Sequence, residues 1–406
     1  MEKLYIQVSG MDKRLIFGLI CLFGVCLLSA QDRKSEPDKK KKRVDLLYAD
    51  EAQADKQLRP DVQVLIGSVR MKHDSMYMFC DSALIYEKIN SVEAFGNVRM
   101  EQGDTLFIYG DYLYYDGMSQ LAMLRENVRM INRNTELTTD SLNYERIPDI
   151  GYYFDGGLIV DSLNQLSSFY GQYSPSTKLA IFNDSVRLEN EQFTLYSDTL
   201  HYNTDSKIAT ILGPSIIVSD SGTIYSSRGW YDTVNNTSLL LDRSQVVSGD
   251  RILTGDSIAY NRELGFGEAF GNMSLQDTAQ HVMLEGQYGF YNEKSEYAFA
   301  TDSARFLEFS QGDTLFLHGD TLKMTTVDSL YREVKAYYGV RFYRTDMQGV
   351  CDSMQFNTRD SILYMYTDPI VWNEQYQIYG DTILIFMNDS SIDFAHVKQF
   401  AFAIQQ

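Results

Sequence analysis

The side chains of this chain that could do chemistry recur periodically along the sequence and do not gather in one place. Asp81, Asp140, Asp198 and Asp256 each precede a Ser or Thr in a repeated phrase. Paired carboxylates are the groups that cleave glycosidic bonds, and clustered ones bind metal ions. A catalytic residue interrupts a repeat, whereas a structural residue keeps to it. We therefore interpret the periodic Asp as an acceptor of backbone hydrogen bonds at a kink in the chain.

The remaining reactive residues form no catalytic or metal-binding motif. The five His are scattered, and the sequence contains no His-x-x-x-His, Cys-x-x-Cys or Gly-x-Ser-x-Gly. Cys80 and Cys351 both occupy the small position before the repeated Asp, so we interpret them as small buried residues that form neither a disulfide nor a metal pair. The sequence predicts no enzyme, no metal and no cofactor.

The spacing of the tyrosines indicates which secondary-structure elements position the repeated Asp residues. Six of them stand 29 residues apart, at Tyr115, Tyr144, Tyr173, Tyr202, Tyr231 and Tyr260. A fixed period of this length indicates a stacked repeat architecture. Two phrases make up the repeat, for example Thr139–Glu145 and Gly96–Met100, and both alternate apolar and polar residues as a β-strand does.

The fold class predicted from this pattern is all-β. We expect an elongated β-jelly-roll, or folded-over solenoid, of about 11 stacked rungs of roughly 29 residues. The two phrases would form the two arms of each rung and stack into two facing sheets with an apolar interior. No amphipathic helix is evident after residue 60, and only six prolines interrupt the whole chain.

The interior could be a filled core or a slot for a ligand. Gly171, Gly229 and Gly289 replace the inward apolar residue in alternate copies, which favours a slot because a filled core would need bulk there. For a slot, the expected ligand contacts are the inward residues Leu113, Tyr115, Leu142, Tyr144, Leu200, Tyr202, Ile258, Tyr260, Val98, Met100, Val128, Met130, Val186 and Leu188.

These phrases resemble a known family. Ile108–Tyr115 and Ala94–Met100 are similar to the repeats of the OstA/LptA family of lipopolysaccharide-transport proteins, and the resemblance covers roughly residues 61–406. It implies a non-enzymatic periplasmic β-jelly-roll whose apolar slot shields the acyl chains of lipopolysaccharide on the way to the outer membrane. The implied partners are lipopolysaccharide or lipid A and other jelly-roll transport proteins.

The two ends of the stack carry a further expectation. The first and last strands of an open stack present unpaired edges, which proteins cover or use for pairing. We therefore expect head-to-tail pairing with another jelly-roll protein or with a second copy of this chain.

The N-terminal residues predict export. Residues 1–30, with the working start at Met11, resemble a signal peptide: Lys13 and Arg14 precede the apolar run Leu15–Leu28. An uncleaved anchor is the alternative. Residues 31–60 read as a charged linker, solvated or in contact with a membrane surface, followed by the repeat region 61–406. The protein is expected in the periplasm, either free or membrane-associated.

Charge excludes one class of partner. Without residues 1–30 the chain has 33 basic and 53 acidic residues, a net charge of −20. This balance provides no basic face for a phosphate backbone, so no nucleic acid is expected. Two other functions compete with the lipid carrier: an extracytoplasmic β-solenoid that binds or cleaves glycans, and a structural scaffold with a filled interior.

Overall fold

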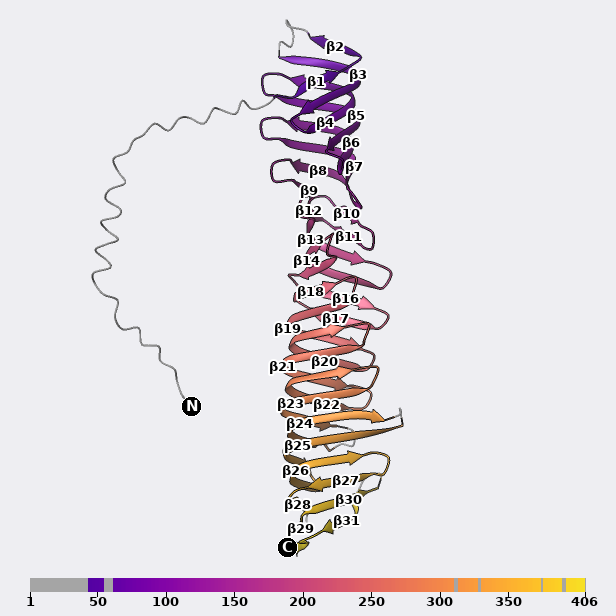
Figure 1. Ribbon diagram of the computed structural model, residues 1–406, viewed down its shortest axis with the longest axis vertical. Coiled ribbons are helices and arrows are strands. Elements are labelled where there is room, and N and C mark those ends of the chain that lie inside the picture. Colours follow the sequence, from indigo (N-terminus) through magenta and orange to yellow (C-terminus); the bar gives the residue numbers. More distant parts are fainter. Residues whose placement is uncertain are drawn as a thin grey trace, which may run out of the picture. The chain divides into compact units, whose positions relative to one another are not determined.

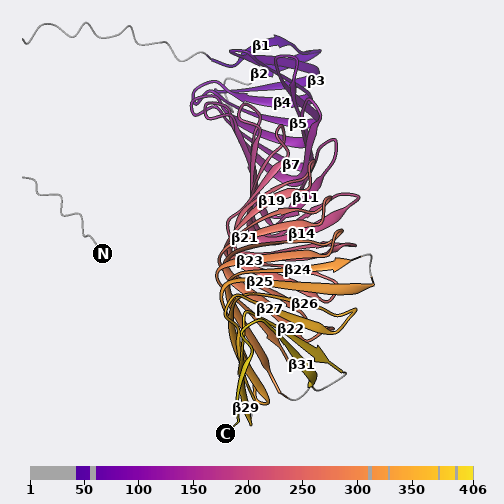
Figure 2. The same cartoon turned by 60° about the horizontal axis from the view of Figure 1, so that its bottom comes forward.

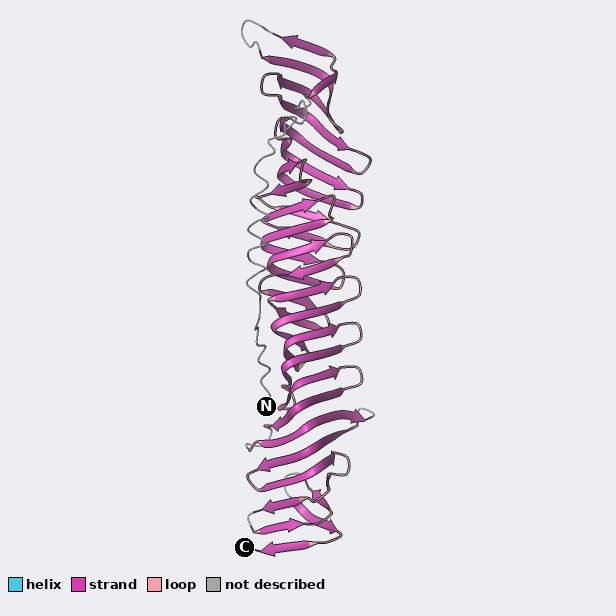
Figure 3. Cartoon of the chain, turned by 60° about the vertical axis from the view of Figure 1, so that its left-hand side comes forward, coloured by secondary structure: helices cyan, strands magenta, loops and turns pink. Residues whose placement is uncertain are grey.

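The computed structural model describes residues 43–54, 61–309, 313–327, 330–373, 375–388 and 392–405. Within these ranges all regular elements are β-strands (Figure 3), and no helix there is long and apolar enough to cross a membrane. Residues 43–406 form one compact unit. The predicted signal peptide and residues 31–42 of the predicted linker lie outside the described residues.

The strands of the described residues belong to one antiparallel sheet of 32 strands (Figure 1). Sixteen have 11 or more residues: β3 (Val62–His73), β4 (Met76–Tyr86), β5 (Ser91–Gln102), β6 (Leu106–Asp116), β7 (Leu121–Asn132), β8 (Thr135–Glu145), β13 (Leu179–Glu189), β14 (Phe193–Asn203), β19 (Thr237–Ser248), β20 (Arg251–Asn261), β21 (Phe266–Asp277), β22 (Val282–Asn292), β23 (Tyr297–Glu308), β24 (Leu315–Val327), β25 (Tyr331–Arg344) and β26 (Met347–Asn357).

The other strands are shorter, because a layer there is split into two halves. They are β1 (Asp45–Tyr48), β2 (Glu51–Ala54), β9 (Ile150–Tyr153), β10 (Gly157–Val160), β11 (Gln165–Ser168), β12 (Tyr170–Ser174), β15 (Ile208–Ile211), β16 (Ser215–Ser219), β17 (Gly222–Ser226), β18 (Arg228–Asp232), β27 (Ile362–Tyr366), β28 (Ile370–Asn373), β29 (Tyr376–Tyr379), β30 (Thr382–Met387), β31 (Ile392–Lys398) and β32 (Phe402–Gln405).

A β-bulge lies near the middle of alternate long strands, and the layers fold over at these bulges. In β5 the register with β6 shifts between Phe95 and Val98, so that Gly96 and Asn97 together oppose one residue, Asp111. Both bulge residues have positive φ, 71° and 43°. A bulge with two residues against one bends and twists the strand that contains it. We call the line of these bulges along the stack the crease.

The repeated Asp lies at the crease and accepts a side-chain hydrogen bond from the next bulge. Asn97 Nδ2 donates to Asp81 Oδ2 over 2.8 Å, and Asn127 Nδ2 donates to Asp111 over 2.6 Å. The same bond joins Asn272 to Asp256. At Asp81, Asp111 and Asp256 the expected structural role is thus found, but the donor is an Asn side chain and not the backbone group that the sequence suggested.

Turns join successive layers alternately at two borders, and we name these the first and the second lip (Figure 2). The first lip comprises turns 74–75, 103–105, 133–134, 161–164, 190–192, 220–221, 249–250, 278–281 and 345–346. The second lip comprises turns 87–90, 117–120, 146–149, 175–178, 204–207, 233–236, 262–265, 293–296 and 358–361.

The predicted β-jelly-roll, a folded-over solenoid, is confirmed, but the predicted roles of the two phrases are wrong. Gly96–Met100 lies in β5 and the next Asp phrase lies in β6, and these strands pair along their whole length in one sheet. Each 29-residue repeat therefore supplies two neighbouring layers, and each layer contributes to both facing halves because the bulge folds it over.

The fold also begins earlier than the sequence suggested. β1 and β2 pair with the two halves of β3, at Asp45↔Lys72 and Glu51↔Ile66. Residues 43–54, which the sequence assigned to the linker 31–60, therefore form the first layer of the sheet.

Candidate functional site

One apolar interior runs through the stack between the two halves of the layers. Its buried side chains form a single cluster from Leu65 in β3 to Ile385 in β30. The alternation of each strand explains the cluster: in β8, Leu142 and Tyr144 point inward while Asn143 between them points outward. The interior is therefore continuous along the stack.

The fourteen residues expected to line a slot all lie in this interior. Tyr260 is the most exposed of them, at 9%, and the others are at most 2% exposed. In this structure they pack against one another as a core. Their contact with a lipid stays a prediction.

The glycines that favoured an open slot do not leave space. A Cβ added at Gly171 would overlap the ring of Tyr153, which is itself buried. At Gly229 and Gly289 an added Cβ would overlap a backbone carbonyl of the neighbouring strand. The volume that the sequence suggested to be free is occupied by an aromatic ring or by main chain, so that interpretation is wrong.

Polar contacts join the two lips over the first two thirds of the stack. His73 Nδ1 lies 2.7 Å from the Tyr115 hydroxyl, and Lys178 Nζ donates to Asn132 Oδ1 over 3.0 Å. We call these contacts the seam; its pairs are Val44–Asn90, His73–Tyr115, Asp74–Gln120, Asn132–Lys178, Asp161–Tyr202, Asp161–Lys207, Asn164–Thr233, Gln192–Asn236, Gln192–Arg262, Ser248–Glu293, Arg251–Tyr291 and Arg251–Glu296.

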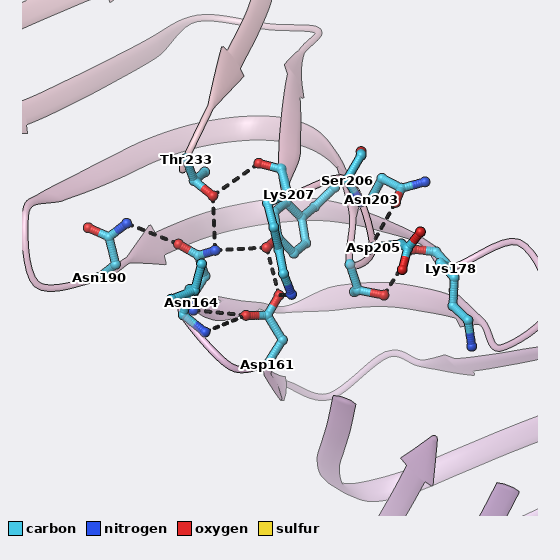
Figure 4. Close-up of polar contacts among 12 residues, drawn as sticks. Asp161, Asn164, Lys178, Asn190, Asn203, Asp205, Ser206, Lys207 and Thr233 are labelled. Atoms are coloured by element: carbon cyan, nitrogen blue, oxygen red, sulfur yellow. Dashed lines mark hydrogen bonds and ion pairs between the residues drawn. The ribbon is translucent and has the colours of Figure 1, made fainter. Parts of the chain in front are cut away.

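A buried carboxylate forms the centre of the seam (Figure 4). The Asp161 side chain is 1% exposed, and its Oδ2 accepts from Lys207 Nζ (2.8 Å) and from the Tyr202 hydroxyl (2.6 Å). Its Oδ1 accepts from the backbone N–H groups of Leu163 and Asn164. Burial raises the pKa of this carboxyl, but the four hydrogen bonds outweigh it and hold the pKa below its usual value.

The amide of Asn164 extends this network to the next layers. Its Nδ2 donates to the Tyr202 hydroxyl over 2.8 Å and to Thr233 Oγ1 over 3.0 Å, while its Oδ1 accepts from Asn190. A carboxylate has about four lone-pair positions, and four donors occupy those of Asp161. The network is therefore suited to holding the lips together and leaves no lone pair for a general base.

Sequence reasoning missed the seam, although a signal existed. Asn132, Asp161 and Asn190 stand 29 residues apart on the first lip, as do Lys178 and Lys207 on the second. On the first lip, Asp161 stands where the neighbouring copies have Asn, and the second lip has a lysine at its own repeat position. An acidic residue matched in this way by a basic one indicates that the two lips are in contact. The contacts themselves span 41 and 69 residues, which no local pattern predicts.

The interior opens beyond Arg251–Glu296, the last of these seam pairs among the residues that the structure describes. In the copies after Tyr291, the repeat position of the tyrosine holds Met324 and Phe356, which have no hydroxyl. Arg332 and Arg344 make contacts on their own lips: the backbone N–H of Arg332 donates to Thr358 Oγ1, and Arg344 pairs with Asp346.

A cavity of about 200 Å³ lies there between the two halves of the layers β22 to β30. Its lining is mainly apolar, and six of the lining side chains (Val282, Leu315, Met324, Val334, Phe356 and Met387) are only partly buried. None of the lining residues belongs to the expected slot set; they are Val282, Phe306, Glu308, Leu315, Leu317, Met324, Arg332, Val334, Phe342, Arg344, Met347, Met354, Phe356, Thr358, Leu363 and Met387.

The described residues contain no group of three or more His, Cys, Asp or Glu that could hold a metal ion. Cys80 and Cys351 are free and buried, as the sequence indicated, and burial raises the pKa of both thiols to about 12. Both cysteines are therefore poor nucleophiles at neutral pH.

The sequence of the chain matches a known protein family. The sequence profile of the OstA-like protein family matches residues 41–198 and 186–256, together more than half of the 406 residues. The chain belongs to the OstA-like protein family. No curated protein sequence matches it.

Among solved structures, the chain is similar to one described as the crystal structure of LptH, the LptA homologous periplasmic component of the conserved lipopolysaccharide transport device from Pseudomonas aeruginosa. The two share 14% identity, with a TM-score of 0.24, over 26% of this chain and 79% of that chain.

Proposed function

We propose that this protein carries a lipid of the lipopolysaccharide class, holding its acyl chains in the apolar interior during transport to the outer membrane, without catalysing a reaction. The cavity between β22 and β30 is the observation that carries the proposal, because it is apolar, partly open and continuous with the buried core. Each CH₂ group that leaves water for such a site gains about 0.8 kcal/mol. Membership of the OstA-like family supports this class of cargo.

The same proposal gives the fourteen interior residues a role. Leu142, Leu200 and their equivalents contact acyl chains when a chain passes into the layers that are closed in this structure. Residues 1–30 serve as the export signal, and the periplasm is the place of action, either free or at a membrane.

Edge strands support the proposed partners. Among the described residues, β1 and β2 pair only with β3, β31 only with β30, and β32 only with β29. Each end of the sheet therefore offers one free strand edge, and pairing through such edges joins jelly-roll proteins, or copies of this chain, head to tail.

Native mass spectrometry of the protein purified from a Gram-negative periplasm tests the cargo. We expect a bound species with the mass of lipopolysaccharide or lipid A. Met354→Trp, which fills the cavity, should abolish it, whereas Gln348→Trp on the solvent face of the same strand should not. A wild-type protein that stays free of lipid after incubation with lipopolysaccharide contradicts the proposal.

One observation favours the structural scaffold instead. From β3 to β20 the inward side chains are fully packed, with Leu113, Tyr144 and Leu200 at 0% exposure. A structural scaffold needs only such a packed interior and no ligand. It predicts no bound lipid in the same mass spectra and an unchanged melting temperature in the presence of lipopolysaccharide.

One observation also supports a glycan-binding role. A surface groove of about 830 Å³ crosses β11 to β19, and Tyr196 and Tyr225 in its lining are exposed on either side of Ile216. Tyrosine rings beside hydroxyl and carboxyl groups suit a sugar surface. Calorimetry with lipid-free lipopolysaccharide oligosaccharide distinguishes this role, because a carrier of acyl chains gives no heat with that ligand.

A further inference from the structure

The seam divides the interior into a closed part and an open part. The seam contacts described above run from Val44–Asn90 near the start of the fold to Arg251–Glu296. In the closed part the inward residues of β6, Leu106 and Ile108, are buried. In the open part the corresponding Leu315 of β24 is only partly buried. The apolar surface that a lipid can reach is therefore concentrated beyond residue 296.

A small second cavity links the two parts. It holds about 40 Å³ and shares Val282, Met324, Arg332 and Val334 with the larger cavity. Its lining also includes Arg251 and Glu296, which are the last seam contact. A hydrocarbon chain that extended from the large cavity toward the closed layers would meet this contact first.

We infer that the cavity between β22 and β30 is the site at which an acyl chain first binds, and that the seam must part, beginning at Arg251, before the chain reaches the closed layers. This inference rests on the proposed function. Three features commit the site to a lipid with an acidic head group: the apolar lining, the partial exposure of six lining side chains, and the guanidinium groups of Arg332 and Arg344 among the lining residues.

The head group follows from the charges around the cavity. The chain is strongly acidic, so an anionic head group is repelled from most of its surface. Arg332 lines both cavities. Arg344 lines the larger one, beside the carboxylate of Glu308, while it pairs with Asp346. A phosphate at this rim would lie close to two of the chain's cations while its acyl chain lies among Leu317, Met354 and Phe342.

Two matched positions allow a direct test. Phe356 and Tyr260 occupy the same place in their repeat phrases and both point inward, one in the open cavity and one in the closed layers. Each is replaced in turn by the photoreactive aromatic residue p-benzoylphenylalanine. A second pair of changes, Ser248→Cys and Glu293→Cys, is joined across the seam by a short cross-linker that contains a reducible disulfide. The linker spans the gap because a cysteine at 293 ends two bonds short of the carboxylate oxygen that meets Ser248 at 2.6 Å.

Purified lipopolysaccharide is the probe, and the adducts formed on irradiation are counted by mass spectrometry. We expect the Phe356 position to form the adduct equally well with the seam disulfide closed or reduced. The Tyr260 position should form it only when the disulfide is reduced. Reduction of the same sample controls for folding, and the buried Cys80 and Cys351 give no competing disulfide.

The other outcomes are separable. An adduct at the Tyr260 position that is unchanged by closing the disulfide overturns the inference and leaves the proposed function intact, because lipid is then bound in the closed layers without parting the seam. Adducts at neither position, together with a lipid-free wild-type mass, overturn both.

Discussion

At the scale of single residues, the tyrosine position of the repeat has two roles. Its ring packs in the core, and in some copies its hydroxyl group also forms a hydrogen bond across the seam. The tyrosine ladder supplies apolar rings to the core along its whole length, and at Tyr115, Tyr202 and Tyr291 the hydroxyl also bonds across the seam. Where the position holds Met324 or Phe356 the ring or chain still points inward, but the interior there opens into the cavity. At these three tyrosines the hydroxyl thus helps to close the layers over the interior.

Tyr202→Phe should weaken the seam with little change to the core. The substitution removes the 2.6 Å hydrogen bond to the Asp161 carboxylate, so we expect a loss of roughly 1.5–3 kcal/mol in the free energy of unfolding. Urea unfolding followed by circular dichroism measures it. Tyr260→Phe is the control, because its hydroxyl belongs to none of the seam pairs, and it should stay within about 0.5 kcal/mol of wild type. Equal losses in the two variants would contradict a special role for the Tyr202 hydroxyl.

The depressed pKa of Asp161 gives a pH dependence of definite sign. Burial alone would raise this pKa, but the bonds from Lys207, Tyr202 and the backbone lower it. A carboxyl whose folded pKa is below its unfolded pKa of about 3.9 stabilises the fold above that pH, and the contribution is lost as the pH falls through the folded pKa.

Wild type should therefore lose stability relative to Asp161→Asn on acidification below about pH 4, while the difference between them stays constant from pH 5 to 8. Melting temperatures across this range provide the measurement. A constant difference down to pH 2 would show that this carboxyl is not the one whose protonation weakens the seam.

At the scale of elements, the bulge converts a plain meander of strands into two facing halves. Gly96 takes φ 71° there, and a Cβ at this position would lie 3.2 Å from both Cβ and Cγ of Asp81. Glycine is the residue that adopts such a φ without strain. Where other residues stand in the bulge, as at Glu126 and Asn127, the same positive φ values are retained. The crease therefore depends on backbone conformation more than on one side chain.

Gly96→Ala and Gly103→Ala separate backbone strain from steric overlap. Both glycines have positive φ, but nothing lies within 4 Å of a Cβ added at Gly103. We expect Gly103→Ala to cost about 1–2 kcal/mol, the usual penalty of the left-handed region. Gly96→Ala should cost measurably more, because Asp81 must also move away from Asn97. Chemical denaturation of the two variants measures the loss in the free energy of unfolding. Equal losses would mean that the Asp81 side chain moves aside from the added Cβ at no cost.

Strand positions and their inward faces could be predicted from the sequence, because the alternation at Leu142 and Tyr144 is enough to specify both. The finding that each 29-residue repeat supplies two neighbouring layers could not be derived from the alternation of apolar and polar residues alone. It depends on which strand contains the bulge. One signal was present in β6: the buried positions run Leu106, Ile108, Gly110 and then change phase to Leu113 and Tyr115. Before Asp111 the even-numbered residues of β6 are buried, and after it the odd-numbered ones are. Both sets can face the same interior only if the strand folds over between them.

Prediction of the binding site was limited by a different cause. The fourteen expected residues are the inward positions of regular copies of the repeat, and regular repeats pack best. The cavity is found where the repeat drifts, at Met324 and Phe356, because a substituted ladder position no longer closes its layer. The drift of these copies is visible in the sequence, but its consequence depends on contacts across the lips, which join residues distant in sequence.

At the scale of the whole fold, the two ends of the sheet determine what the stack can join. The last layer, β31 and β32, presents Phe394 and Phe402, each about half exposed, beside a free strand edge. The first layer, β1 and β2, is also exposed along its length. An exposed edge with apolar side chains favours pairing with another strand, and lysine on such an edge opposes it.

The double change Phe394→Lys and Phe402→Lys should therefore abolish concentration-dependent association of the protein, both with itself and with another jelly-roll partner. Analytical ultracentrifugation over a wide concentration range measures the effect. Phe169→Lys, at a similarly exposed phenylalanine within the stack, is the matched control and should leave association unchanged. A wild-type protein that remains strictly monomeric, alone and with a jelly-roll partner, would contradict head-to-tail pairing. Continued lipid binding by such a monomer would then identify a carrier that acts singly and not as one segment of a bridge.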